Sequence, residues 1–162
     1  MKEFFGAFIA ALFGILSSLF LDYLKKKNEQ QKALRTVVSE LERINRFLEN
    51  YAVLIKNSMH GGFVFNKILS SNSWRNCKHI LMDIVKKDNI KEIENIYFFC
   101  EESDRKMELA IQAEMLGNTG LKNEFLKFFW GMIDLNIISK DSKDCMLDKV
   151  IKLTNELKKQ IK

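Results

Sequence analysis

Basic side chains gather between residues 60 and 79 of this sequence. The cluster consists of His60, Lys67, Arg75, Lys78 and His79. Ser73 is a typical helix N-cap, and the free backbone N–H groups in the first turn of a helix attract anions. Arg75 falls in that turn, where its guanidinium can bind a phosphate through two parallel hydrogen bonds. We therefore predict a ligand-binding site that comprises Arg75, His79, His60 and Lys78.

Each of these residues also fits a simpler interpretation, a charged helix face in contact with water. A symmetric oligomer would favour the site, because one basic side chain is then presented several times around an axis. Trp74 has two interpretations as well. It could stack on a base, but it heads an apolar helical stripe and is better explained as a core residue.

The patterns of common catalytic and metal sites are absent from the sequence. It has no phosphate-binding glycine loop, no His-Glu-x-x-His motif and no nucleophile in a recognisable turn. The three cysteines, Cys77, Cys100 and Cys145, show no metal-binding or disulfide spacing and suit a reducing compartment. We predict a protein that is not an enzyme and holds no metal and no cofactor.

The elements that would position the basic cluster are helices. Pro is absent and Gly occurs only 7 times in 162 residues, which favours an all-α fold. Apolar residues follow a heptad spacing after residue 33, namely Leu34, Val37, Leu41, Ile44, Leu48, Tyr51 and Ile55. This pattern predicts one long helix that ends near residue 57. The apolar seam could face sister chains or pack on its own domain.

The N-terminal segment predicts a membrane anchor. Residues 4–21 form an uncharged run of eighteen residues, about the length of a membrane-spanning helix, and Lys25, Lys26 and Lys27 follow it. The positive-inside rule then places the C-terminal part in the cytoplasm. We expect a single-pass protein of the bacterial inner membrane. Its domains would be an anchor, residues 1–24, and a cytoplasmic all-helical domain, residues 25–162, with a juxtamembrane helix over 25–57 and a bundle of about four to five helices.

Small residues recur along the predicted span, at Gly6, Ala10, Gly14 and Ser18. Such a stripe lets helices approach closely in lipid, which favours a homo-oligomer. The alternative is that Gly and Ala are simply common in membrane helices.

Charge is distributed unevenly along the chain. Residues 25–87 hold 13 Lys and Arg against 5 Asp and Glu, whereas residues 88–121 hold 3 against 8. With a net charge of only +5 and no recognition-helix motif, binding of duplex DNA is not expected. The acidic stretch over residues 88–114 could instead recruit a protein partner, which would require an exposed apolar patch there.

A family resemblance adds to this interpretation. The apolar span, the helix after it, and the stretch SSNSWRNC at residues 70–77 ahead of an apolar helix with Tyr97 resemble the layout of small membrane effectors of type III CRISPR systems. The resemblance implies a helical cytoplasmic domain that binds cyclic oligoadenylate as a tetramer.

These observations lead to one function hypothesis and two rivals. The leading hypothesis is a membrane-anchored antiviral effector that binds a cyclic oligonucleotide, such as cyclic tetra-adenylate, and disrupts the membrane through its oligomeric span. One rival is a phage or envelope tether of the spanin or superinfection-exclusion type, with a coiled-coil stalk. The other is a membrane adaptor for a protein partner. The predicted partners are thus a membrane, further copies of the chain and a cyclic oligonucleotide.

Overall fold

The computed structural model describes residues 2–56, 67–69, 73–137 and 145–161. This part of the chain contains five α-helices and no strand, which confirms the prediction of an all-α fold. The helices are α1 (Lys2–Lys56), α2 (Ser73–Leu81), α3 (Lys87–Met115), α4 (Thr119–Ile137) and α5 (Met146–Lys158).

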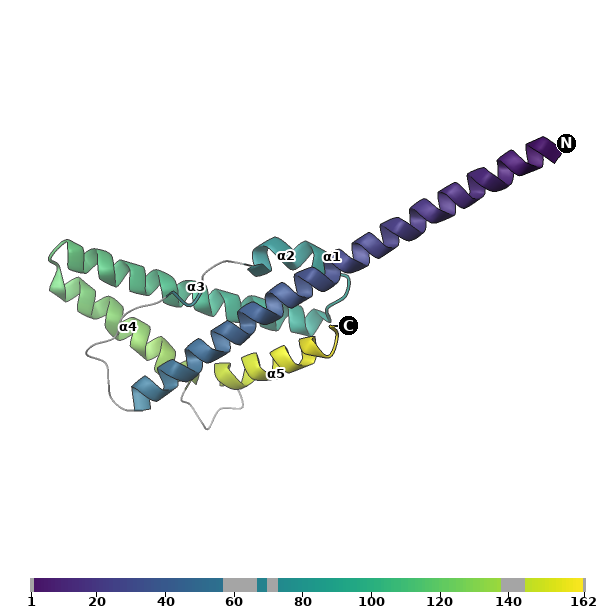
Figure 1. Ribbon diagram of the computed structural model, residues 1–162. Helices are drawn as coiled ribbons and strands as arrows, with labels where there is room; N and C mark the ends of the chain where they lie inside the picture. The colour runs from purple at the N-terminus through teal and green to yellow at the C-terminus, as the bar shows by residue number, and fades with distance from the viewer. Residues whose placement is uncertain (1, 57–66, 70–72, 138–144, 162) are drawn as a thin grey trace.

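The longest element is α1, an uninterrupted helix of 55 residues. The absence of Gly and Pro between residues 15 and 56 removes the residues that most weaken helices. The C-terminal half of α1 lies among the other helices, and its N-terminal half projects away from them (Figure 1). The long helix expected to end near residue 57 is therefore present, and it crosses the predicted domain boundary at residue 24 without a break.

The packing of the core shows which way the heptad seam of α1 faces. The fully buried side chains of α1 are Leu34, Val37, Leu41, Ile44, Leu48 and Tyr51. They belong to one apolar cluster with residues of α2, α3, α4 and α5, including Leu81, Ile93, Phe129 and Leu157. The seam thus packs within its own chain. Trp74 is buried in the same cluster, which confirms that it is a core residue.

The hairpin of α3 and α4 turns at a glycine. Gly117 has a φ of 71°, a left-handed conformation in which a Cβ would be strained. Its neighbour Asn118 accepts a hydrogen bond of 3.0 Å on Oδ1 from the backbone N–H of Leu121 and so caps the start of α4. These two residues fix the reversal that returns α4 along α3 (Figure 1).

The predicted membrane span requires a correction. In the part of the chain that the structure describes, no helix carries an apolar stretch long enough to cross a bilayer. The side chains of residues 2–11 lie outside the description. This finding contradicts the predicted location, a single-pass protein of the bacterial inner membrane with its C-terminal domain in the cytoplasm.

Candidate anion-binding groove

The predicted ligand residues on α2 are engaged with carboxylates of α3. Nη2 of Arg75 lies 3.3 Å from Oε1 of Glu101. Nζ of Lys78 forms an ion pair with Glu94. The two cations therefore point toward α3, and the charge that each would offer an anion is already partly neutralised.

Two of the remaining members of the basic cluster, His79 and Lys67, lie within the described residues. His79 is exposed on α2, and His60 lies outside the described residues. Lys67, which precedes α2, forms an ion pair with Glu108 of α3. The assignment of a ligand to Arg75, His79, His60 and Lys78 stays a prediction.

A different set of basic residues lines a groove on the body. The groove has a volume of about 520 Å³ and lies along α1, and the first residue of α2 also lines it. Its lining consists of Arg35, Thr36, Ser39, Glu40, Arg43, Arg46 and Ser73. Three guanidinium groups face one carboxylate in this groove, so its local charge is positive.

Helical geometry explains why these arginines share a groove. With 3.6 residues per turn, Arg35, Arg43 and Arg46 fall within an arc of about 80° on α1. This arc lies opposite the apolar seam that includes Leu41 and Ile44. The packing that buries the seam therefore turns the arginines outward together.

The single carboxylate of the groove is buried and holds three helices together. Glu40 is only 6% exposed. Its Oε2 accepts a hydrogen bond of 2.6 Å from the phenol of Tyr97 on α3 and one of 3.0 Å from the backbone N–H of Ser73 at the start of α2. Buried charges need such partners, because an unsatisfied carboxylate in the core is costly. The floor of the groove is thus a fixed polar contact among α1, α2 and α3.

Arg43 is the arginine nearest to that carboxylate. Its Nη2 lies 3.6 Å from Oε1 of Glu40, which is close enough for an ion pair but too long for a hydrogen bond. The same Nη2 is buried and has no hydrogen-bond acceptor. This atom therefore lies beside Glu40 inside the protein, and the groove offers an anion the exposed 35% of the Arg43 side chain. The hydroxyl of Ser39 adds a neutral donor to the lining, whereas the hydroxyl of Thr36 donates to the backbone carbonyl of Lys32 at 3.0 Å.

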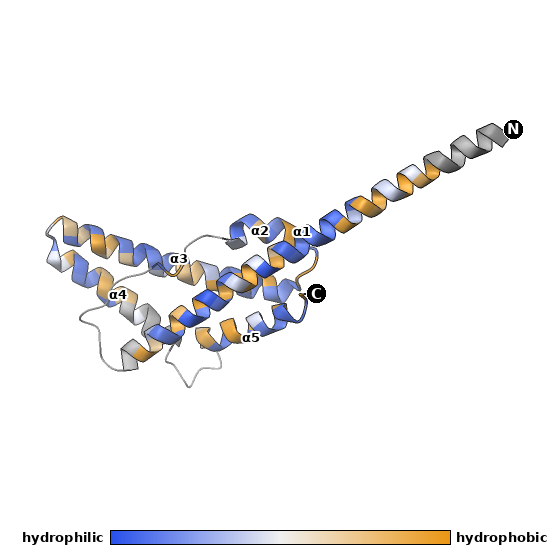
Figure 2. Cartoon of the chain, in the orientation of Figure 1, coloured by the Kyte–Doolittle hydropathy of each residue, from blue (hydrophilic) through white to orange (hydrophobic). Residues whose placement is uncertain are grey.

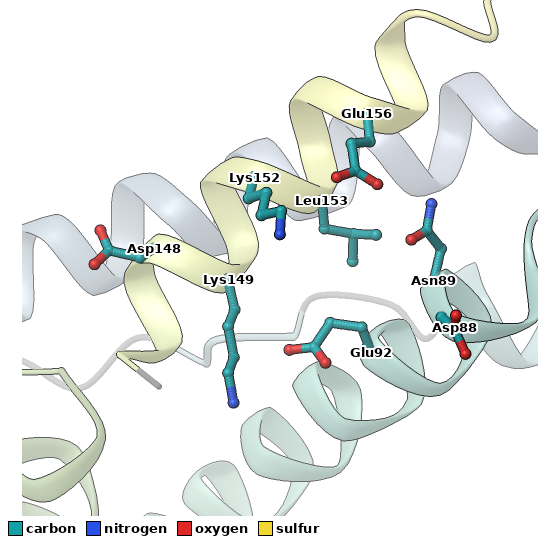
Figure 3. A pocket seen from close by; sticks show the side chains of 8 residues that line it. All are labelled: Asp88, Asn89, Glu92, Asp148, Lys149, Lys152, Leu153 and Glu156. Carbon is teal, nitrogen blue, oxygen red and sulfur yellow. The ribbon is translucent and has the colours of Figure 1, made fainter. Parts of the chain in front are cut away.

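A second hollow, shown in Figure 3, lies between the start of α3 and α5. Its volume is about 360 Å³, and its charged lining consists of Asp88, Glu92, Asp148, Glu156, Lys149 and Lys152. Carboxylates outnumber ammonium groups four to two, so this hollow does not favour anions. Among the described residues, no group of three His, Cys, Asp or Glu side chains could hold a metal ion.

The thiols of Cys100, which is buried, and Cys77, which is half-buried, are not activated as nucleophiles. Burial raises the pKa of Cys100 far above its ordinary value of 9.0, and burial also raises the pKa of Cys77. Both thiols are therefore protonated at neutral pH, and the thiol is a much poorer nucleophile than the thiolate.

The groove residues were missed by the sequence analysis, although the sequence held a signal for them. Arg35, Arg43 and Arg46 are spaced by eight and three residues, which places them on one face of a long helix. The contribution of Ser73 could not be foreseen, because it lies 33 residues from its partner Glu40.

Comparisons with known proteins supply no identity: no protein-family model, curated protein or solved structure matches this chain.

Proposed function

We propose that this protein is a non-enzymatic binding module that recognises a ligand with several phosphate groups in the groove of α1. The observation that carries the proposal is the convergence of Arg35, Arg43 and Arg46 on a groove that contains one carboxylate. Guanidinium groups bind phosphates through bidentate, charge-assisted hydrogen bonds, which are stronger than those between neutral groups.

The spacing of the arginines favours a ligand with phosphates at more than one position. Arg35 and Arg46 are eleven residues apart, or about 16 Å along the helix axis. A single phosphate cannot contact both ends of such a row. The resemblance described above gives cyclic oligonucleotides as the first ligands to test.

The position of Glu40 indicates how occupancy of the groove would affect the body. A phosphate that binds Arg43 would compete with Glu40 for the guanidinium. Glu40 also accepts hydrogen bonds from Ser73 and Tyr97, so its environment is coupled to the start of α2 and to α3. We expect ligand binding to change the stability of the contact between α1 and α2.

Isothermal titration calorimetry on the full chain tests this function. The panel consists of cyclic tetra-adenylate, other cyclic oligonucleotides, pyrophosphate and inorganic phosphate. We expect binding of a multi-phosphate ligand that weakens steeply with added salt, because each phosphate contact releases counterions. The double variant Arg43→Gln, Arg46→Gln should bind at least about tenfold more weakly, because a hydrogen bond to a charged group contributes about 1.5–3 kcal/mol.

Arg105→Gln is the matched control, because Arg105 is exposed on α3 outside the groove and pairs with Glu102. It should bind as the parent does. If the parent binds no member of the panel, the proposed function is wrong. If the double variant binds as tightly as the parent, the ligand lies elsewhere on the protein.

A further inference from the structure

The part of α1 over residues 12–24, which we call the arm, exposes many large apolar side chains. Nine of them are between 38% and 66% exposed, namely Leu12, Phe13, Ile15, Leu16, Leu19, Phe20, Leu21, Tyr23 and Leu24. None of the nine belongs to the apolar core, whose first member on α1 is Ala33. Figure 2 shows orange, hydrophobic bands along the part of α1 that projects from the body.

An ion pair marks where the arm leaves the body. Nζ of Lys26 lies 3.2 Å from Oδ2 of Asp83, in the turn that follows α2. Before Lys26, the side chains of the arm are exposed to solvent. The arm is therefore a continuation of a packed helix, held rigidly at its base and uncovered along its length.

The uncovered area is too large for an isolated chain in water. A large apolar side chain has roughly 150–250 Å² of surface, so nine that are about half exposed present about 1,000 Å². Monomeric soluble proteins rarely expose contiguous apolar patches of more than a few hundred Å². Some apolar surface must cover the arm.

We infer that the arms of further copies of this chain cover it, so that the protein self-associates through residues 12–24. If one neighbouring arm covers half of the apolar area, a pair buries about 1,000 Å² in total, which is the minimum for a specific interface. With 3.6 residues per turn, eight of the nine apolar side chains fall on one half of the helix, and Gly14, Ser18 and Asp22 lie on the other half. The assembly therefore contains at least two arms, packed through this apolar half of the helix.

This inference is independent of the ligand in the groove, because the arm and the groove lie on different parts of α1. The arginines of the groove begin at Arg35, beyond the base of the arm at Lys26. An assembly of this kind would also present several copies of the groove.

Sedimentation velocity of the full chain in detergent-free buffer tests the inference. We expect the parent to sediment as an assembly of two or more chains. The variant Leu16→Glu, Phe20→Glu places carboxylates on the arm and should sediment as a single chain. The variant Met115→Glu, Leu116→Glu is the matched control, because both residues are highly exposed apolar side chains at the turn between α3 and α4. It should keep the mass of the parent.

Far-UV circular dichroism verifies that each variant keeps its helices, and Leu16→Gln, Phe20→Gln replaces the charged pair if that pair unfolds. The inference is overturned if the parent sediments as a single chain. It is also overturned if the arm variants keep the mass of the parent or if the control loses it.

A second experiment measures flotation of the protein with vesicles of phosphatidylcholine and phosphatidylglycerol. Chemical crosslinking that finds only single chains on the floated vesicles would assign the arm to lipid and reject self-association.

Discussion

The phenol of Tyr97 on α3 donates a hydrogen bond of 2.6 Å to Oε2 of Glu40 on α1, and both side chains are buried. Burial, and then the hydrogen bond to Glu40, raise the pKa of Tyr97, so the phenol stays a donor at neutral pH. The same Glu40 oxygen accepts the backbone N–H of Ser73. This pair therefore fixes α3 and the start of α2 to the helix that carries the arginines of the groove.

Removal of this hydrogen bond should destabilise the fold. Tyr97→Phe leaves a buried carboxylate with one partner fewer, and we expect the free energy of unfolding to fall by about 1.5–3 kcal/mol. Urea denaturation measures the change. Tyr23→Phe is the control, because Tyr23 is exposed on the arm. Equal stability of the two variants would mean that the bond between Tyr97 and Glu40 contributes nothing.

Asp104 should give the fold a specific pH dependence. Its carboxylate accepts the backbone N–H groups of Ile68 at 2.8 Å and of Leu69 at 2.9 Å. Burial nevertheless raises its pKa above the ordinary value of 3.8. The folded state then binds the proton more tightly than the unfolded state. The stabilisation from this carboxyl group is fully present below pH 3.8 and is lost as pH rises through the raised pKa.

The free energy of unfolding of Asp104→Asn should therefore decline less than that of the parent as pH rises from acid to neutral. Urea denaturation at a series of pH values measures the difference between variant and parent. Asp148→Asn is the control, because Asp148 is exposed on α5. Parallel curves for Asp104→Asn and the parent would contradict this assignment.

The seam of α1 should contribute to stability within one chain. Leu41 is fully buried, and Leu41→Ala should lower the free energy of unfolding by about 2–5 kcal/mol through lost burial and a cavity. Val53→Ala, at an exposed position of the same helix, should change it by less than about 0.5 kcal/mol. The loss at Leu41 should not depend on protein concentration. A loss that grows on dilution would indicate that the seam faces another copy.

The turn between α3 and α4 should require a glycine. Gly117→Ala places a Cβ on a residue with φ of 71°, at a cost of about 1–2 kcal/mol in the free energy of unfolding. Gly131→Ala is the matched control, because Gly131 lies inside α4 and a Cβ there would meet no atom within 4 Å. It should be neutral or stabilising by up to about 1 kcal/mol. Thermal denaturation of the two variants compares them, and equal melting temperatures would contradict the role of Gly117.

The variant Arg75→Ala distinguishes the ligand site predicted from the sequence from the groove of α1. Its ion pair with Glu101 is exposed, so Arg75→Ala should lower the free energy of unfolding by at most about 1 kcal/mol. If the ligand binds in the groove, Arg75→Ala should keep the affinity of the parent, whereas Arg43→Ala should lose it. Calorimetric titration with the same ligand measures both. Loss of affinity in Arg75→Ala alone would favour the site predicted from the sequence over the groove.

The helices were predictable from local sequence patterns. Gly-poor, Pro-free segments with regular apolar spacing form helices for local reasons, and Gly117 and Asn118 end and begin helices through their own backbone and side-chain chemistry. The same spacing predicted the apolar seam from Leu34 to Tyr51. The spacing did not predict what the seam packs against, because a heptad pattern is the same whether its partner is another chain or the same one.

The grouping of charges on the surface depends on how the helices pack. The sequence showed a basic stretch and an acidic stretch as two separate candidate surfaces. In the structure Arg75 meets Glu101, 26 residues away, and Lys78 meets Glu94, so each stretch partly neutralises the other. The arginines of α1 stay grouped in a groove because α1 is fixed by contacts such as that of Tyr97 with Glu40, across 57 residues. The physical reason is that helix formation depends on neighbours in sequence, whereas the pairing of charges depends on distances in space, which only the packing of the helices sets.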